Sequence, residues 1–307
     1  MLHTIFTRRA SLRQIGLLAL LAGVLAGAAP VPRPPAFAPW IDGTRAAEPE
    51  TQVQRIDRDT FVIRQSVKTN FEAPFLYLLF GTDRALLVDS GAGGLKLRPT
   101  IDHLVADWRH AHHDRPVRLI VAHSHGHGDH HAGDDEFRAR PDTDVVGLAP
   151  AEVATFFQIA DWPNGLGRID LGGRLLSIIP TPGHQPAHIM IYDAHTQLLL
   201  SGDMLYPGRL YVPVDRFDAY RASADRLAAF AAGHPIRALL GAHIEMTTTP
   251  GQDYPMEAPA HPAEHGLALL PAAIAELQAA THAAAMPPMI DRHADFIVFP
   301  VPPRPGG

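Results

Sequence analysis

Residues 123–133, which read HSHGHGDHHAG, constrain the fold of this chain more than any other segment. They follow an apolar run at residues 117–122 that is rich in β-branched residues, and such a run predicts a buried strand. A dense group of polar side chains directly after a buried strand indicates a functional site at a strand end. The glycines Gly126 and Gly128 permit a tight turn there, with close approach of the backbone.

The spacing inside this segment predicts metal ligands. His125 and His127 are two residues apart, so in an extended chain they point to the same side and can share one metal ion. Asp129 and His130 follow as the chain turns, and they can face a neighbouring metal. A competing register that starts at His123 would need an acid at position 127. The alternative of a solvated His-rich tract explains the composition, but it does not explain the ligand candidates that follow.

Three further candidate ligands stand after predicted strands. They are His184 in Thr-Pro-Gly-His, Asp203 in Ser-Gly-Asp and His243 in Gly-Ala-His. The strands are expected at residues 175–179, 198–200 and 238–240. A lone histidine or aspartate in a loop is weak support for a site, but the order and placement of these three make the set specific.

The rest of the chain alternates between strands and helices without an internal repeat. Further strands are expected at residues 75–80, 85–88, 145–146 and 189–192. Helices are expected at residues 95–110, 217–232 and 262–285, the last with a possible break at Pro271. The alternation predicts one layered α/β domain. The last twenty residues are rich in proline and give no clear pattern.

Composition excludes several classes of protein. The chain has no cysteine, so disulfides, thiolate zinc sites, iron–sulfur clusters and a cysteine nucleophile are excluded. Its net charge is −6 and it has no basic patch, which argues against a nucleic-acid partner. The 19 histidines are unusual for 307 residues, and histidine is a common metal ligand.

The N-terminal residues predict export. Arg8 and Arg9 form a twin arginine, an apolar run covers residues 15–25, and small residues 26–28 resemble a cleavage site. We therefore expect a signal peptide at residues 1–28 read by the twin-arginine export machinery, a Pro-rich linker at 29–50 and a single domain at 51–300. The protein would then be periplasmic or secreted. The apolar run is too short to cross a membrane, so no membrane span is expected in the mature form.

Residues 51–250 resemble the metallo-β-lactamase-fold hydrolase superfamily. The motif His-x-His-x-Asp-His stands at residues 125–130, and Asp89 matches an early Asp-x-Gly turn behind the ligands. The resemblance implies a four-layer αββα sandwich with metals at one sheet edge. It implies a first metal held by His125, His127 and His184, and a second held by Asp129, His130 and His243. Asp203 would bridge both.

The resemblance also implies the chemistry. Nitrogen and oxygen ligands suit two zinc ions, and iron or manganese would fit the same set. A hydroxide between the metals would attack a small-molecule ester, thioester, lactone or related carbonyl. Asp129 would orient the hydroxide. Tyr206 stands three residues after Asp203, where some lactonases have a tyrosine that assists the oxyanion; ordinary loop packing is the equal alternative.

The bridging Asp203 separates branches of the superfamily. True dizinc β-lactamases generally lack it, so the chain resembles the glyoxalase II, lactonase and phosphodiesterase branches more. A periplasmic β-lactamase, a mononuclear-iron sulfur dioxygenase and a non-catalytic metal-binding module remain alternatives. The sequence gives neither the substrate nor the oligomeric state.

Five other histidines need a separate interpretation. His188 and His131 are expected to lie behind the ligands or toward solvent, and His123 to pack behind the site. Residues 261–265 match a His-x-x-Glu-His pattern of a different zinc protease class. Pro262, however, suits the first turn of a helix, so a helix start with His261 at its cap is the preferred interpretation.

Overall fold

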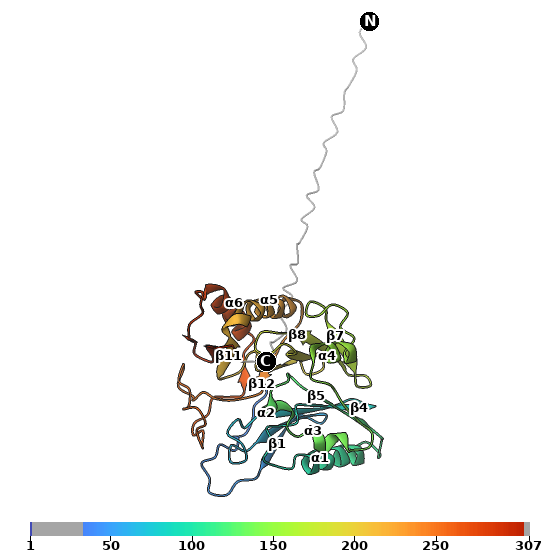
Figure 1. Ribbon diagram of the computed structural model, residues 1–307. Helices are drawn as coiled ribbons and strands as arrows, with labels where there is room; N and C mark the ends of the chain where they lie inside the picture. The colour runs from blue at the N-terminus through green and yellow to red at the C-terminus, as the bar shows by residue number, and fades with distance from the viewer. Residues whose placement is uncertain (2–32, 304–307) are drawn as a thin grey trace. The chain divides into compact units, whose positions relative to one another are not determined.

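The computed structural model describes Met1 and residues 33–303 (Figure 1). By its internal contacts the chain divides into residues 1–31 and residues 32–307, and only the second unit is described below. The predicted signal peptide, apart from Met1, and residues 29–32 of the predicted linker lie outside the described residues. None of the helices within residues 33–303 combines the length and the apolar character needed to cross a bilayer.

The first sheet contains the N-terminal strands. Its order is β1 (Thr51–Asp57), β2 (Thr60–Gln65), β3 (Phe75–Phe80), β4 (Arg84–Val88), β5 (Arg118–Ala122) and β6 (Thr143–Val145). The strands are antiparallel from β1 to β4 and parallel from β4 to β6. Helix α1 (Arg98–Ala111) makes the crossover from β4 to β5 that a parallel pair requires.

The second sheet contains strands from the later part of the chain. Its order is β13 (Ala268–Leu269), β12 (Ala238–Gly241), β10 (Leu198–Gly202), β9 (Ile189–Asp193), β8 (Leu175–Pro180) and β7 (Gly167–Asp170). Only the pair β10 and β12 is parallel, and helix α5 (Phe217–Gly233) makes that crossover. The carboxyl ends of β10 and β12 therefore lie side by side.

Three hydrophobic clusters define the layers. In β3, Tyr77 and Leu79 belong to the cluster shared with the inner face of the second sheet, whereas Leu76 and Leu78 pack with α1. This alternation is the period of two that side chains follow along a strand. A third cluster joins the outer face of the second sheet to α5 and α6 (Ala272–Ala283). In Figure 1, α1 and α3 (Asp134–Arg138) lie outside the first sheet and α5 and α6 outside the second, which gives the expected four-layer αββα sandwich.

The third sheet was not predicted. It has three strands, β11 (Arg209–Pro213), β15 (Ile297–Val301) and β14 (Asp291–Arg292). Strand β15 runs parallel to β11 although almost ninety residues separate them in sequence. The prolines of this region hide the strand from a search for periodicity, and pairing with β11 supplies the hydrogen bonds that make it a strand.

The predicted helix at residues 262–285 begins ten residues later than expected. Helix α6 covers Ala272–Ala283, and residues 262–271 contain only the short strand β13. Pro271 is the N-cap of this helix, so Pro271 rather than Pro262 marks the start. The prediction that His261 caps a helix was therefore wrong. The remaining short helices are α2 (Gly128–His131), α4 (Pro150–Phe156) and the 3₁₀ helix η1 (Val214–Arg216).

Residues 33–50 form no helix or strand, yet they contact the domain. Phe37 and Trp40 pack against the cluster between the two sheets, and the Trp40 ring lies 5.0 Å from that of Phe75. The side-chain oxygens of Gln52 and Gln54 on β1 accept hydrogen bonds from backbone N–H groups of this segment. The segment is therefore attached along the domain that follows it.

Candidate metal centre

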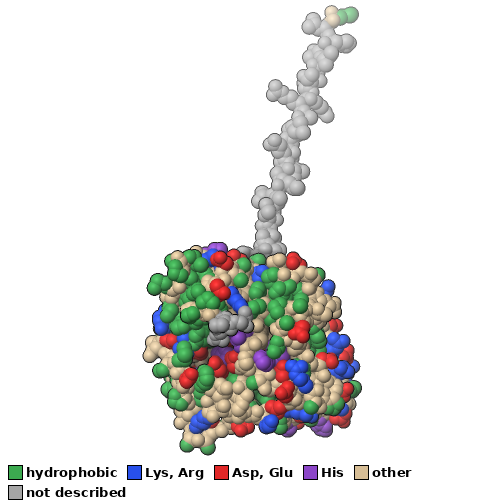
Figure 2. All heavy atoms as spheres, viewed as in Figure 1, with side chains coloured by type: hydrophobic (Ala, Val, Ile, Leu, Met, Phe, Trp, Pro, Cys, Tyr) green, Lys and Arg blue, Asp and Glu red, His purple; other side chains and the backbone are tan. Residues whose placement is uncertain are grey.

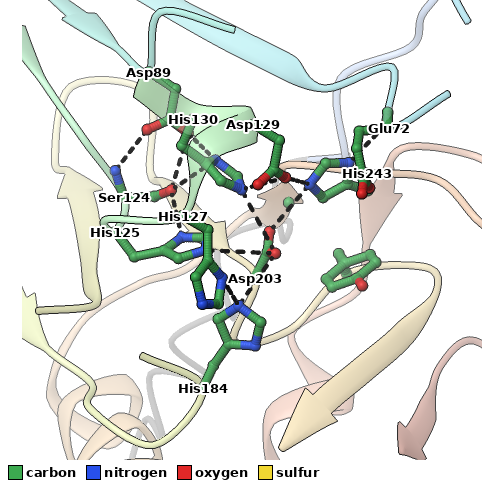
Figure 3. A network of polar contacts seen from close by, with 12 residues as sticks. Glu72, Asp89, Ser124, His125, His127, Asp129, His130, His184, Asp203 and His243 are labelled. Carbon is green, nitrogen blue, oxygen red and sulfur yellow. Dashed lines mark hydrogen bonds and ion pairs between the residues drawn. The ribbon is translucent and has the colours of Figure 1, made fainter. Parts of the chain in front are cut away.

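The seven predicted ligands come from four strand ends at one edge of the two sheets. His125, His127, Asp129 and His130 follow β5 and enter α2, and the other three follow β8, β10 and β12. Figure 3 shows the side chains converging on one point from these segments. The sequence predicted this grouping, and the structure brings all seven residues together in two adjacent sets.

The first group, which we call the nitrogen set, consists of His125, His127 and His184. His127 Nδ1 lies 2.9 Å from His125 Nε2 and 2.9 Å from His184 Nε2, and the last two atoms are 3.2 Å apart. Nitrogens bound to one tetrahedral zinc ion at the usual bond length would lie about 3.3 Å apart. The triangle of nitrogens is thus nearly the size that one shared ion requires.

The second group, which we call the mixed set, consists of Asp129, His130, Asp203 and His243. Asp129 Oδ2 lies 3.0 Å from His130 Nε2 and 3.3 Å from His243 Nε2. Asp203 Oδ1 lies 3.5 Å from His243 Nε2. This set combines two carboxylates with two imidazoles, so it carries charge that the nitrogen set lacks.

Asp203 belongs to both groups by position. Its Oδ2 atom lies 3.8 Å from His125 Nε2, 3.5 Å from His184 Nε2 and 3.6 Å from His130 Nε2. Gly202, just before it, has a φ of +51° and lies so close to His188 and Ser124 that a Cβ would clash with both. The His188 ring nitrogen Nε2 accepts a hydrogen bond from the Asp203 backbone N–H. These contacts fix the carboxylate between the two sets.

The groups behind the ligands fix how the rings point. The Nδ1 atoms of His184 and His243 donate to the backbone carbonyls of Tyr211 and Glu72, at 2.6 and 2.8 Å. His130 Nδ1 donates to Asp89 Oδ2 at 2.9 Å (Figure 3). Each bond leaves Nε2 as the nitrogen available to a metal, which is the usual arrangement around metal-binding histidines.

Asp89 occupies a strained position that suits this supporting role. It has a φ of +67°, in the left-handed region that aspartate tolerates better than most residues. Its carboxylate also accepts hydrogen bonds from the backbone and side chain of Ser124. Asp89 therefore ties the end of β4 to the start of the histidine motif, as its match to the Asp-x-Gly turn suggested.

The pKa values of the histidines are shifted in opposite directions in the two sets. Burial lowers the pKa of His125 and His184, and burial together with His184 lowers the pKa of His127 to about 4. For His243 burial acts in the same direction, but Asp203 and Asp129 outweigh it and raise its pKa to about 10. The same balance raises the pKa of His130, where Asp129 and Asp89 dominate over burial.

Two buried polar atoms support metal binding at this centre. Within the described residues, His130 Nε2 and Asp203 Oδ1 are buried and have no hydrogen-bond partner. A buried polar atom without a partner is costly, yet each of these atoms lies within 3.6 Å of other ligand atoms. Ligand atoms that crowd together without hydrogen-bonding one another are what a site for shared cations requires. The donor set fits divalent metals that accept nitrogen and oxygen ligands.

Three other histidines near the centre lie outside the two sets. His123 Nε2 lies 2.8 Å from Asp134 Oδ1 behind the site, and His188 Nδ1 lies 2.8 Å from the Thr181 hydroxyl. His131 is partly exposed and belongs to neither set.

Tyr206 lies beside the centre, but its hydroxyl is used elsewhere. The side chain is buried, and its ring centroid lies 5.6 Å from that of His243. The hydroxyl donates to the carbonyl oxygen of Arg209 and lies 3.1 Å from Glu245 Oε2. This geometry favours the packing interpretation, and a part for Tyr206 in stabilising an oxyanion stays a prediction.

A cavity of about 380 Å³ opens onto both sets. Besides five of the ligands, residues that the sequence did not single out form its walls, among them Glu72, Arg209, Glu245 and Phe299. They come from the β2–β3 loop, the third sheet and the segment after β12. No local sequence pattern marks these residues. Phe299, for example, reaches the site only because β15 pairs with β11.

This chain is similar to known proteins in sequence and in fold. The family model described as "Metallo-beta-lactamase superfamily" matches residues 70–243, which include all seven ligands. The match covers more than half of the chain, so this protein belongs to the metallo-beta-lactamase superfamily and is a metal-dependent hydrolase.

The sequence identity between this chain and individual relatives is modest. The chain is 25% identical over 209 residues to "Acyl-coenzyme A thioesterase MBLAC2" of Gallus gallus, covering 56% of this chain and 72% of that protein. It is 33% identical over 105 residues to "Hydroxyacylglutathione hydrolase" of Ectopseudomonas mendocina, covering 34% of this chain and 39% of that protein. The solved DIM-1 metallo-beta-lactamase aligns with a TM-score of 0.52 at 13% identity, over 77% of this chain and 99% of that one. That likeness shows the fold alone.

Proposed function

We propose that this chain is a dinuclear hydrolase that cleaves thioesters or esters. The observation that carries the proposal is the position of Asp203, whose Oδ2 lies 3.5–3.8 Å from nitrogens of both sets. A carboxylate so placed suits two adjacent ions, with the nitrogen set on one and the mixed set on the other. The names of the thioesterase and the hydroxyacylglutathione hydrolase support a thioester as the substrate.

Different residues of the chain would have different roles in the proposed reaction. When bound, the two ions would lower the pKa of a shared water molecule and polarise the substrate carbonyl. Asp129 would orient the attacking water. Hydrolysis would then break the C–S or C–O bond of the substrate, giving a carboxylate, a thiol or alcohol, and one released proton. Asp89, Tyr211 and Glu72 hold the histidine rings through the hydrogen bonds described above.

A substrate panel tests this proposal. The metal-loaded chain is assayed on a thioester, an aryl ester, a lactone and a cephalosporin, each beside Asp129→Asn. We expect thioester or ester turnover that the variant loses. Turnover of the cephalosporin alone would refute the proposal, and so would oxygen uptake with iron and no hydrolysis.

We propose zinc as the metal at both sets. Ligands of nitrogen and oxygen without sulfur also accept iron and manganese, so the metal content of the purified chain is the test. Elemental analysis should give about two zinc ions per chain. Iron or manganese at that stoichiometry would replace zinc in the proposal without altering the ligand assignment.

We also propose that the protein acts outside the cytoplasm. The support is the twin arginine Arg8-Arg9 followed by an apolar run. Replacing both arginines by lysine in a bacterial host should keep the protein in the cytoplasmic fraction. Unchanged export of that variant would contradict the assignment to the twin-arginine machinery.

A further inference from the structure

The cavity wall beside and beyond the candidate metal ligands carries acidic, tyrosine and histidine side chains. We call it the distal wall, and it is formed by Glu72, Tyr211, Glu245, Tyr254, Glu257 and His261. It brings together the β2–β3 loop, the third sheet and the segment at residues 254–261. Near the centre of the face shown in Figure 2, acidic and histidine side chains lie close together.

His261 is the most informative residue of this wall. It is 6% exposed, its ring stacks on Tyr254 with centroids 4.5 Å apart, and its backbone N–H donates to the carbonyl of Asp42. Its Nδ1 atom lies 3.1 Å from Glu264 Oε1. Within the described residues no partner meets Nε2, the remaining polar atom of this buried, cavity-lining ring.

The contact with Glu264 occupies one ring nitrogen of His261 and leaves Nε2 for another partner. Arg64, which is fully buried, holds the Glu264 carboxylate through two hydrogen bonds of 2.7 and 3.0 Å. Burial alone would raise the pKa of Glu264, but Arg64 and His261 lower it overall. An ionised carboxylate can only accept, so the His261 Nδ1–H donates to Glu264. Nε2 is then the ring atom left to face the cavity, and it accepts a hydrogen bond when it carries no proton. The residues of the His-x-x-Glu-His pattern thus form a histidine–glutamate pair in the cavity wall.

Apart from the candidate metal centre, the described residues that line the cavity offer hydrogen-bond acceptors but no unengaged Lys or Arg. Among the described residues that line it, Arg209 is the one Lys or Arg. Its guanidinium is already engaged with Glu245 at 3.2 Å, Asp253 at 2.9 Å and the Tyr211 hydroxyl at 2.7 Å. Glu257, in contrast, is exposed at the cavity edge. The Glu72 side chain has no hydrogen bond or ion pair within residues 33–303, and burial raises the pKa of its carboxyl. A phosphate or carboxylate on the substrate would find no partner here.

We propose that the substrate carries a cationic N–H group on the side away from its scissile carbonyl. The carboxylates of Glu72 and Glu257 would attract the charge, His261 Nε2 would accept the N–H, and the rings of Tyr211 and Tyr254 would offer cation–π contacts. The inference rests on the proposed hydrolysis and narrows its substrate class. A cationic substrate would distinguish this chain from hydrolases that act on anionic thioesters.

Three thioesters with one acyl group test the inference. They are the S-butyryl esters of dimethylaminopropanethiol, mercaptopropanol and mercaptopropionate, which carry a positive, zero and negative charge. With the metal-loaded full chain we expect kcat/KM to fall in that order, with a span of about tenfold or more. Equal rates, or faster turnover of the anionic ester, would overturn the inference.

Matched variants locate the effect. Glu72→Gln and Glu257→Gln should each lower the ratio of cationic to neutral kcat/KM by about threefold, as expected for screened charges. Glu50→Gln removes the same charge from an exposed side chain outside the cavity wall, and the ratio should stay unchanged. Loss of preference in Glu50→Gln, or none in either cavity variant, would contradict the assignment.

His261 has its own test. The quaternary, N-methylated form of the cationic ester keeps the charge but has no N–H. His261→Phe keeps an aromatic ring for stacking and removes the acceptor, so it should reduce the preference for the tertiary over the quaternary ester. A merely structural role would change both rates alike, and that result would overturn the role of Nε2.

A binding measurement separates this inference from the proposed hydrolysis. Dimethylaminopropanol and propionate are titrated into the metal-loaded chain and followed by calorimetry. Binding of the amine that Glu72→Gln weakens, with no thioester turned over, would retain the cation site and refute the hydrolysis. Thioester turnover without charge preference or amine binding would retain the hydrolysis and refute the cation site.

Discussion

The nitrogen set and the mixed set lie at one sheet edge, with Asp203 of the mixed set close to both, and they differ in charge. His125, His127 and His184 contribute neutral rings whose pKa values burial lowers. In the mixed set, Asp129 and Asp203 outweigh burial and raise the pKa of His243. Without metal, ion pairs between carboxylates and imidazoles already hold the mixed set together. The nitrogen set brings three imidazoles together and contains no carboxylate. A metal should therefore order the nitrogen set more than the mixed set.

The largest effect is expected at Asp129, which belongs to the mixed set and faces the cavity. Asp129→Asn should lower kcat/KM by about a thousandfold or more, because it removes a charged ligand and the group that orients the attacking water. Steady-state kinetics on the metal-loaded variant measure the loss, and circular dichroism confirms a folded chain. Near-full activity would show that the mechanism is assigned to the wrong residue.

Truncation of one ligand in each set compares the two directly. His184→Ala and His243→Ala should each leave about one metal ion per chain, since each removes a ligand of one set only. Elemental analysis after dialysis gives the stoichiometry. Two bound ions in either variant would argue against the division into two sets, and none in both would show that the ions bind only as a pair.

A smaller effect is expected behind the mixed set. Asp89→Asn weakens the carboxylate that holds His130 Nδ1, and loss of such a support costs about tenfold to a hundredfold in metal affinity. Competition with a chelator measures it. Asp134→Asn is the matched control, because Asp134 holds His123, which belongs to neither set. Equal losses in the two variants would mean that the effect is general rather than specific to the ligand.

The smallest expected effect is on the pH dependence of stability without metal. The unfolded chain takes up a proton at His127 near pH 6.5, whereas the folded chain does so only near pH 4. Stability therefore falls as the pH drops through that window, by about 2 kcal/mol at pH 5.

Urea unfolding of the metal-free chain at pH 7 and pH 5 measures this loss, and His127→Gln should lack it. His243 acts in the opposite direction, because its raised pKa gives stability that is lost as the pH rises from 6.5 toward 10. An unchanged pH dependence in His127→Gln would contradict the difference between the sets.

Local chemistry made much of the site predictable. His125, His127, Asp129 and His130 lie within six residues, so chain geometry alone brings them together after β5. Strand ends marked His184, Asp203 and His243, because buried strands have a clear apolar pattern and their ends meet at one edge. The same patterns predicted β3, β4, β5 and α5 nearly to the residue.

Long-range pairing decided the rest. Arg64 and Glu264 are 200 residues apart, and almost ninety residues separate β11 from β15. No local pattern encodes either contact, because a buried ion pair and a proline-containing strand gain their stability only from partners that folding supplies. The sequence by itself therefore determined the candidate metal ligands and the layered fold. Only the tertiary structure decided which side chains line the cavity, and hence what kind of substrate the site can accept.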